Sequence, residues 1–443
     1  MKRSLLFTLL ISAGARSQTP VDLSLEDAIN SGKENSRMLH VAVLKADAAT
    51  AKAQEASVAL LPTIKFDGSY RRLSDITPFA LTFAPLIPTP IEINPNIPNV
   101  YNLKVGLQEP LFAGFRLQSN ADAAGYLADA AEAERKGGEA DLVLTIVNAY
   151  WSLYQAIQVK KFVDENVQRL KSYRADTQNL MKTGMATRND LLKIDVQLSN
   201  ARLAQVDAEN DVDVAMMNLN NALGQPADRP LHITSTPATP TLEDSLAITD
   251  VLSADVLVGR ALDRRDDLAA MKSRVEASRL GVTAAQAGWW PLVNLTANYV
   301  YARPNQRYLP AVDKFKGTWE VGIGMQFDIW NWGTTLYQTD QARSQLLQSE
   351  LLLDQLRDNA ALEVRRSRLA VVRAANRISV AQEAIDQADE NARTTDEKYR
   401  NGLATSTDVL DASFAVLQAR TNVTGALVER EIALARLRKA VGG

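Results

Sequence analysis

Residues 184–192 read Gly-Met-Ala-Thr-Arg-Asn-Asp-Leu-Leu, and residues 402–410 read Gly-Leu-Ala-Thr-Ser-Thr-Asp-Val-Leu. The two stretches share a glycine, an Ala-Thr pair, an aspartate and a final leucine at matching positions. The same spacing pairs Gly106 with Gly324. Similarity that recurs at a fixed shift indicates a tandem duplication of one structural unit.

The duplication sets the expected boundaries along the chain. We expect a first repeat at residues 20–225, a connector rich in Pro, Thr and Ser at residues 226–249, and a second repeat at residues 250–443. Residues 1–17 have a basic start, a short apolar run and small residues at the end, which is the pattern of a cleaved signal peptide. Because the chain contains no cysteine, this signal does not lead to a lipoprotein.

The composition excludes several classes of protein. Lys and Arg number 49 against 52 Asp and Glu, so a net charge of −3 offers no basic surface for nucleic acid. With no Cys and only His40 and His232, the chain lacks the side chains for thiol catalysis and for most metal or triad chemistry. No phosphate-binding loop or nucleophile elbow occurs. We therefore expect no enzyme, no metal site and no cofactor.

Each repeat is expected to contain one very long helix. Residues 114–183 contain no proline, and about 70 residues at 1.5 Å each would form a rod of roughly 105 Å. The counterpart spans residues 333–401, where apolar residues recur every seven positions with alanines three positions further on, as in a coiled coil. These residues are Val364, Val371, Ile378, Ile385 and Ala392, with Ala374, Ala381 and Ala388.

Four segments alternate apolar and polar residues, which argues against a simple dimeric coiled coil. Alternation over about ten residues is typical of a membrane β-strand, with apolar side chains toward lipid and polar side chains toward a lumen. For any one segment alone, an ordinary half-buried sheet would be the better explanation. The apolar positions are Ile64, Phe66 and Tyr70; Leu103, Val105 and Leu107; Val293, Leu295, Ala297, Tyr299 and Tyr301; and Trp319, Val321, Ile323, Met325 and Phe327.

The context of these segments favours a membrane. The connectors at residues 71–98, rich in proline, and 302–316, rich in polar residues, suit a cell exterior. About eight strands are the fewest that close a barrel, so four strands per chain require several copies. Aromatic residues gather where strands meet helices, as an interfacial aromatic girdle does; they are Trp289, Trp290, Trp330, Trp332, Phe112 and Phe115.

The order of these features resembles the TolC-type outer-membrane efflux protein family. The resemblance is carried by the signal peptide, the duplicated halves and a glycine-containing turn in each helix pair. It is carried further by Pro62 and Pro291 at the helix-to-strand junctions and by the sequence Pro-Leu-Phe-Ala-Gly at residues 110–114. These features cover the chain from about residue 20 to its end.

The resemblance implies a mixed α and β membrane protein. Three chains, as a homotrimer, would share a twelve-stranded transmembrane β-barrel in the lipid of the outer membrane and a coiled-coil α-helical barrel, or tunnel, in the periplasm. Such a channel would be the passive exit duct of a tripartite export system. Its partners would be a periplasmic adaptor (membrane fusion) protein and an inner-membrane transporter. We favour efflux of small molecules, and type I protein secretion stays an alternative.

The sequence departs from the family pattern at two places. Residues 328–333 read Asp-Ile-Trp-Asn-Trp-Gly where the first repeat has its Pro-Leu-Phe pattern. Members of the family can carry an arginine two residues after the second tip glycine that ties neighbouring protomers together, and here that residue is Ala404. Arg188 and Arg400 lie nearby in sequence. We therefore do not expect an arginine at this position to hold neighbouring protomers together in the closed state.

The chain is expected to reverse direction at Gly184 and Gly402. Glycine at a helix end readily adopts the left-handed conformation that ends the helix. The Thr-x-x-Asp sequences that follow have the spacing of capping boxes that begin the return helices. Their residues are Thr187 and Asp190 in the first repeat and Thr405 and Asp408 in the second.

These turns are the candidate functional site. Asp408 and Asp411 are three residues apart and share one face of a helix. By resemblance we assign them, with Asp190, to the periplasmic aperture, where repulsion among copies should raise some carboxyl pKa values and attract cations. The turns are also the expected adaptor contact, through Gly184, Met185, Thr187, Tyr399, Gly402, Leu403 and Thr405, and Tyr399 is expected to hydrogen-bond across the tip.

A periplasmic adaptor protein is the main competing interpretation. Such a protein would also be exported and rich in coiled coil. It should, however, contain a β-rich lipoyl-like region, and it should lack strands with membrane-type alternation. A requirement for detergent during extraction would favour the channel, whereas extraction by salt or alkali would favour the adaptor.

Overall fold

The computed structural model describes residues 21–77, 79–83, 87–238 and 253–443. The predicted signal peptide at residues 1–17 and residues 239–249 of the predicted connector lie outside the described residues. The chain divides into two compact units, and each unit contains parts of both repeats. The helical unit comprises residues 1–42, 135–266 and 357–443, and the sheet unit comprises residues 43–134 and 267–356.

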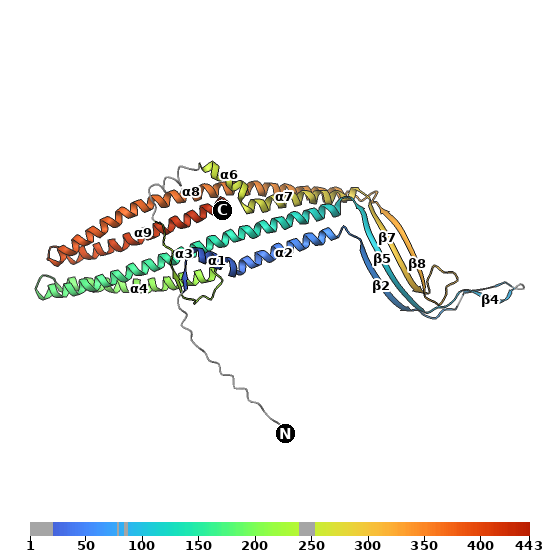
Figure 1. The fold of residues 1–443 in the computed structure, drawn as a ribbon, viewed down its shortest axis with the longest axis horizontal. Coiled ribbons are helices and arrows are strands. Elements are labelled where there is room, and N and C mark those ends of the chain that lie inside the picture. Colours follow the sequence, from blue (N-terminus) through green and yellow to red (C-terminus); the bar gives the residue numbers. More distant parts are fainter. Residues whose placement is uncertain (1–20, 78, 84–86, 239–252) are drawn as a thin grey trace, which may run out of the picture. The chain divides into compact units, whose positions relative to one another are not determined.

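The first repeat begins with two consecutive helices and ends with a long helix and its return helix (Figure 1). Its elements, with the strand that follows it in the connector, are β1 (Val21–Leu23), α1 (Leu25–Asn35), α2 (Arg37–Val58), β2 (Thr63–Arg72), β3 (Phe79–Phe83), β4 (Ile87–Asn94), β5 (Asn99–Ala113), α3 (Arg116–Lys182), α4 (Arg188–Ala222) and β6 (Leu231–Ile233).

The second repeat has the same order of helices and main sheet strands, and among the described residues it has no counterpart of β1, β3 or β4. Its elements are α6 (Ala254–Arg264), α7 (Asp266–Ala285), a 3-10 turn (Gln286–Trp289), β7 (Leu292–Arg303), β8 (Lys316–Gln326), α8 (Thr334–Arg400) and α9 (Ser406–Ala440). The long helices α3 and α8 contain 67 residues each, and the return helices α4 and α9 contain 35 each. These equal lengths confirm the internal repeat. In the described part of the chain, no helix combines the length and the apolar character that crossing a membrane demands.

The sheet unit contains a four-stranded antiparallel sheet with the strand order β2-β5-β7-β8, and β3 pairs with β4 in a separate two-stranded antiparallel sheet (Figure 1). Successive side chains of each strand point to opposite faces of the sheet. One face carries the predicted apolar positions, and Phe66 and Trp319 on that face are 68 and 72% exposed. The other face is polar, with Asn298 opposite Glu320 in the register. The end strands β2 and β8 each have one neighbour among the described residues.

Both repeats change from strand to long helix through two residues with positive φ. Gly114 and Phe115 have φ values of 60° and 67°, and Trp332 and Gly333 have 55° and 79°. A Cβ atom at Gly114 would lie 2.7 Å from the backbone oxygen of Ala287, so the close approach requires glycine. The two repeats therefore build the same kind of junction from different sequences.

In the helical unit, most of the predicted heptad positions of α8 are buried, and Ala381, Ile385 and Ala388 are half-buried. Val364 and Ala374 are fully buried, and Val371, Ile378 and Ala392 are nearly so. Val364 packs against α6 and the end of α9, and Ala392 packs against Ala412 and Val416 of α9. The seven-residue spacing thus marks the buried seam of the helix, as coiled-coil geometry requires.

The largest fully buried side chain among the described residues of the helical unit is that of Tyr150 on α3. Its hydroxyl donates to the carbonyl oxygen of Leu23 at 3.0 Å and accepts from the amide of Ser235 at 2.9 Å. These two residues flank a parallel pair of strands, β1 and β6, in which His232 lies 2.7 Å from Asp22. The predicted connector is therefore not irregular throughout, because β6 is held against the start of the first repeat.

We expect Tyr150→Phe to destabilise this strand pair by about 1 kcal/mol, because the half-buried amide of Ser235 loses its acceptor. Proteolysis near residues 230–238 should become faster, which mass spectrometry of the fragments would measure. Tyr154→Phe is the matched control, since among the described residues no group hydrogen-bonds its hydroxyl. Equal protease sensitivity of the two variants would contradict this role of Tyr150.

Candidate functional site

Each long helix ends at a tight turn, and we call the two turns together the tip: residues 183–187 between α3 and α4, and residues 401–405 between α8 and α9. Gly184 and Gly402 have φ values of 79° and 72°, which is the predicted left-handed conformation. The amides of Met185 and Leu403 each donate back into the last helical turn at 2.8 Å. The tip is therefore a fixed structure.

The return helices begin with capping boxes, as predicted. Thr187 Oγ1 accepts from the amide of Asp190 at 3.2 Å, and the Asp190 carboxylate accepts from the amide of Thr187 at 2.9 Å. Thr405 and Asp408 make the same pair of bonds at 3.3 and 2.7 Å. Each box satisfies backbone donors that a helix start otherwise leaves without a partner.

The two capping aspartates differ in their second carboxylate oxygen. Oδ1 of Asp190 accepts a 2.8 Å hydrogen bond from the hydroxyl of Ser406, the first residue of α9. This carboxylate therefore links the α3–α4 hairpin to the α8–α9 hairpin. In the part of the chain that the structure describes, nothing donates to Oδ1 of Asp408, whose side chain is exposed. Asp408 thus fits the predicted aperture better than Asp190 does.

Hydrogen bonds lower the carboxyl pKa of both capping aspartates. The hydroxyl and amide of Thr187, followed by Ser406, hold the pKa of Asp190 below its ordinary value. The amide and hydroxyl of Thr405 do the same for the pKa of Asp408. Within one chain these carboxylates are therefore stabilised in their ionised form. The rise in pKa that we expect from repulsion among three copies stays a prediction.

Asp411 is exposed on α9 and lines a groove of about 330 Å³ formed by α3, α4 and α9. The groove is otherwise polar on one side, with the side-chain amides of Asn166, Gln197 and Asn200. Phe414 also lines it, although its ring is 66% exposed. Phe414 is not among the residues predicted from the sequence. Its spacing of three residues from Asp411 was the available signal, because residues three apart share a helix face.

A buried cluster beneath the tip joins all four helices. Tyr399 of α8 is 3% exposed, and its hydroxyl hydrogen-bonds Thr177 Oγ1 of α3, so the predicted bond across the tip is present. Burial raises the pKa of the Tyr399 hydroxyl. Tyr399 therefore supports the tip from inside, and Ala404 packs against the same cluster. Its buried members are Val167, Leu170, Tyr173, Ile194, Leu198, Ala201, Tyr399 and Val409.

A charged side chain adds a second link between the two hairpins. Arg420 of α9 lies 2.8 Å from Glu165 of α3 and 3.3 Å from Asp389 of α8. Ser413 of α9 donates to Asn166 of α3 at 2.7 Å. The hairpins are therefore joined by polar contacts along their length as well as at the tip.

The two apolar tip residues are exposed, as predicted. Met185 and Leu403 are 57 and 78% exposed. The Met185 side chain also covers Gly402, where a Cβ atom would lie 3.0 Å from its terminal methyl. A contact of these side chains with an adaptor stays a prediction.

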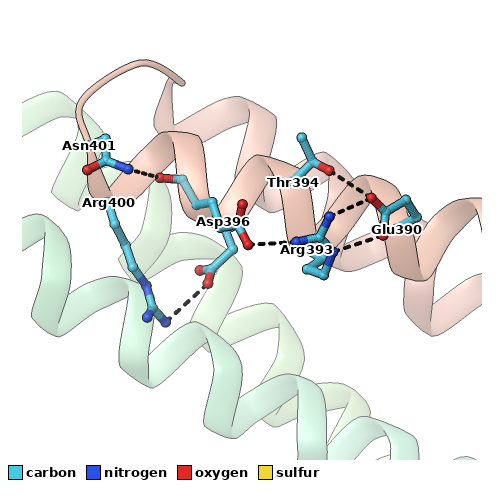
Figure 2. A network of polar contacts seen from close by, with 7 residues as sticks. Glu390, Arg393, Thr394, Asp396, Arg400 and Asn401 are labelled. Atoms are coloured by element: carbon cyan, nitrogen blue, oxygen red, sulfur yellow. Dashed lines mark hydrogen bonds and ion pairs between the residues drawn. The ribbon is translucent and has the colours of Figure 1, made fainter.

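Ala404 is the residue two positions after the second tip glycine, and the nearest preceding arginine in sequence is Arg400. Arg400 lies 3.1 Å from Asp396, four residues earlier on its own helix (Figure 2). Arg393 lies 2.7 Å from Glu390 (Figure 2). It also lies 2.7 Å from Glu397, and its hydrogen bond to Glu390 lowers the pKa of the Glu390 carboxyl. These pairs are exposed and lie within one helix, so they contribute little to stability.

The predicted aromatic girdle residues form two clusters in the sheet unit. Phe112, Phe115 and Trp290 meet edge to face, with ring centroids 5.5 to 6.2 Å apart. Trp330 and Trp332 form the second cluster, with centroids 5.9 Å apart. Trp289, the neighbour of Trp290 in sequence, is exposed. Their position in a lipid interface stays a prediction.

The link between Asp190 and Ser406 should weaken in acid. Because the pKa of Asp190 is lowered on folding, its contribution is complete above the ordinary value of 3.8 and is lost as pH falls through the folded value. The backbone amides of residues 404–412 should therefore exchange faster than the intrinsic pH dependence of exchange predicts, but only below about pH 4. Asp190→Asn should keep only the smaller excess that comes from the Thr405–Asp408 cap within the same residues. The same acid profile in both proteins would contradict the assignment.

The comparison with known proteins gives concordant results. The chain is 25% identical to the outer membrane efflux protein BepC of Brucella suis, over 72% of this chain and 68% of that protein. It is 23% identical to the toluene efflux pump outer membrane protein TtgC of Pseudomonas putida, over 95% of this chain and 83% of that protein. It is also 23% identical to the proteases secretion protein PrtF of Dickeya chrysanthemi, over 64% of this chain and 60% of that protein.

A solved structure of the outer-membrane channel OprN has the same fold. It matches with a TM-score of 0.78 at 20% identity, over 95% of this chain and 90% of that chain. The family described as outer membrane efflux protein matches residues 28–225 and 257–443, which fall one in each repeat. The chain belongs to the outer membrane efflux protein family, and it is an outer membrane efflux channel of the TolC type.

Proposed function

We propose that three copies of this chain form a passive exit duct, with a twelve-stranded β-barrel in the outer membrane and an α-helical tunnel in the periplasm. The proposal assigns no chemical step, metal or cofactor to the duct. It also assigns residues 1–17 to a signal peptide that is removed during export.

The observation that carries this proposal is the four-stranded sheet with its exposed apolar face. In hydrocarbon, every backbone donor and acceptor needs a partner, so a sheet with open edges must gain further strands. An apolar face toward lipid and a polar face toward water is the pattern of a barrel wall. Pairing of β8 from one copy with β2 of the next would close the barrel.

Exposed side chains on the return helix α4 support the same assembly. They are apolar, and they recur at intervals of three, four and seven residues, as in an uncovered coiled-coil seam. A neighbouring copy would cover this seam and bury its apolar surface. The residues are Leu192, Val196, Leu203 and Val206.

We assign the tip to a periplasmic adaptor, which would connect the duct to an inner-membrane transporter. The exposed side chains of Met185 and Leu403 support this assignment, because apolar residues at a helical hairpin turn suit packing between helices. Cross-linking in intact cells, followed by purification of this chain, should recover an adaptor and a transporter. Met185→Asp with Leu403→Asp should lose both partners.

We favour small molecules as the exported class. The match to the toluene efflux protein TtgC extends over 95% of this chain, whereas the match to the protease secretion protein PrtF extends over 64%. Type I protein secretion is the second candidate because the identity to both relatives is 23%. The co-purified transporter should discriminate between the two, and deletion of the gene should sensitise cells to small toxic compounds.

The assembly itself can be tested with purified protein. Detergent-extracted protein should have the mass of three chains and should give stepwise ion current in a planar lipid bilayer. A monomer that is freely soluble without detergent and gives no current would contradict the proposed duct.

A further inference from the structure

The loop between β7 and β8, residues 304–315, is fastened to the end of the sheet. Asn305 is buried, and its side-chain amide donates to the carbonyl oxygen of Lys316 at 3.0 Å and to Thr318 Oγ1 at 3.1 Å. Its side-chain oxygen accepts from the amide of Arg307 at 3.0 Å. One buried asparagine thus uses both ends of its side chain to fix the loop.

Arg307 holds the loop against the polar face. Its guanidinium donates to the carbonyl oxygen of Trp319 at 3.0 Å and to Glu320 at 3.1 Å. The other oxygen of Glu320 accepts from Asn298 at 3.0 Å. Because Asn298 and Glu320 oppose each other on the polar face of the sheet, Arg307 covers that face.

The end of the loop is fastened to β7 on the apolar face. Phe315 stacks on Tyr301, with ring centroids 5.1 Å apart. Arg303 makes a bidentate ion pair with Asp313 at 2.6 and 3.0 Å. The loop therefore straddles the sheet end and is anchored on both faces, so it forms a fixed wall.

A pocket of about 230 Å³ lies between this loop and the polar face. Arg71 of β2 lines the pocket, and among the described residues its guanidinium has no carboxylate within ion-pair distance. Asn102 of β5 also lines it, and its side-chain oxygen is buried without a donor in the described part of the chain. Glu320, the carboxylate in the lining, is already bonded to Arg307 and Asn298.

This chemistry selects an anion. A guanidinium without a counter-ion binds carboxylate or phosphate groups, because the charge-assisted hydrogen bonds between them are short and strong. A buried acceptor without a donor favours a ligand that also carries a hydroxyl or amine group. The volume suits one such group rather than a whole drug-sized molecule.

We propose that this pocket is a subsite for the carboxylate or phosphate group of an anion that passes the outer mouth of the duct, with Arg71 as its binding residue. The inference rests on the proposed trimer, because that assembly turns the polar face toward the lumen. Three copies place three such guanidinium groups at the mouth, whereas the exposed tip carboxylates supply the opposite charge at the other end. The two ends of the duct then differ in ion preference.

Adjacent arginines provide a matched test. Arg71 lies on the polar face, and Arg72, which donates to Asn99 at 3.2 Å, lies on the opposite face of the same strand. The background is Asp408→Ala with Asp411→Ala, so that the tip does not dominate selectivity. In a planar bilayer with a KCl gradient, Arg71→Glu should lower the anion-to-cation permeability ratio at least about twofold, and Arg72→Glu should not.

Salt and phosphate supply independent readouts. The effect of Arg71→Glu should be clear at 0.1 M salt, where the Debye length is about 10 Å, and should vanish at 1 M, where it is about 3 Å. Inorganic phosphate should reduce the current of the background channel more than sulfate does, because only phosphate carries a hydroxyl donor. Asn102→Leu should remove this difference, and Arg71→Gln should weaken the block by both anions.

Two results would overturn the subsite. One is an equal change of ion preference in Arg71→Glu and Arg72→Glu, and the other is a phosphate block that Arg71→Gln leaves intact in a heat-stable oligomer. Absence of any current from the unaltered protein would instead overturn the duct, and the subsite with it.

Discussion

Replacement of Asp408 and Asp411 by alanine is expected to raise the concentration of trivalent cation that blocks the channel at least about tenfold. In the proposed trimer, three copies of each carboxylate surround one narrow opening, and a ring of like charges binds multivalent cations strongly. The measurement is single-channel current in a planar bilayer, with hexamminecobalt added on the side of the tip.

The control for this experiment is Asp190→Ala. Asp190 and Asp408 occupy the same position of the same capping box, so either alanine variant removes the same kind of helix cap. The second oxygen of Asp190 is bonded to Ser406, which keeps this carboxylate at the link between hairpins. We therefore expect Asp190→Ala to keep most of the block. If Asp190→Ala weakened the cation block as much as the double variant does, Asp190 would have to line the aperture as well.

The single variants separate capping from pore lining. Asp411 takes no part in a cap, so Asp411→Ala should weaken the block without lowering thermal stability. Asp408→Asn removes the charge but keeps a side chain that can hydrogen-bond, so it should weaken the block with a smaller loss of stability than Asp408→Ala. If the strength of the cation block instead decreased in proportion to thermal stability across these variants, the carboxylates would act through the fold rather than through their charge.

The elements that sequence predicts well are those encoded by local pattern. The absence of proline between residues 114 and 183 predicts one long helix, and α3 fills that interval almost completely. The alternation around Val321 predicts β8, and the spacing from Thr405 to Asp408 predicts a cap. In each case neighbouring residues determine the structure, because helix periodicity, strand alternation and capping all act over a few positions.

The contacts that sequence does not predict join segments far apart in the chain. Tyr399 is expected to bond across the tip, but its partner Thr177 lies in the other repeat, more than two hundred residues away. Ser406 reaches Asp190 in the same way. A duplication indicates that the repeats are alike, yet it does not give the offset at which they pack against each other. That offset follows from the buried cluster beneath the tip.

The loop at residues 304–315 shows the same limit. Its composition predicts only a polar connector at a cell exterior. The position of Arg307 over the polar face depends on a carboxylate in β8 and on an amide in β7, so the contact requires the register of the two strands. Likewise, alternation along β2 places Arg71 and Arg72 on opposite faces, but only the pairing of β2 with β5 brings Arg71 near Asn102 in one pocket.

Tyr399→Phe combined with Arg420→Ala is expected to raise the ratio of open to closed channels about thirtyfold. Opening requires the two hairpins to move relative to each other, and both side chains join them in the present arrangement. The hydroxyl bond and the partly exposed ion pair together stabilise this arrangement by about 2 kcal/mol after allowance for solvent screening. Single-channel recording of the open fraction would measure the change.

Arg373→Ala is the matched control for this pair. Arg373 also forms an ion pair, but its partner Glu429 lies on α9, within the same hairpin, so its loss does not separate the hairpins. A double-mutant cycle of Tyr399→Phe and Thr177→Val should be strongly non-additive, since either change alone breaks the one bond. Opening by Arg373→Ala to the same extent would show that general loosening of the helices, and not separation of the hairpins, gates the channel.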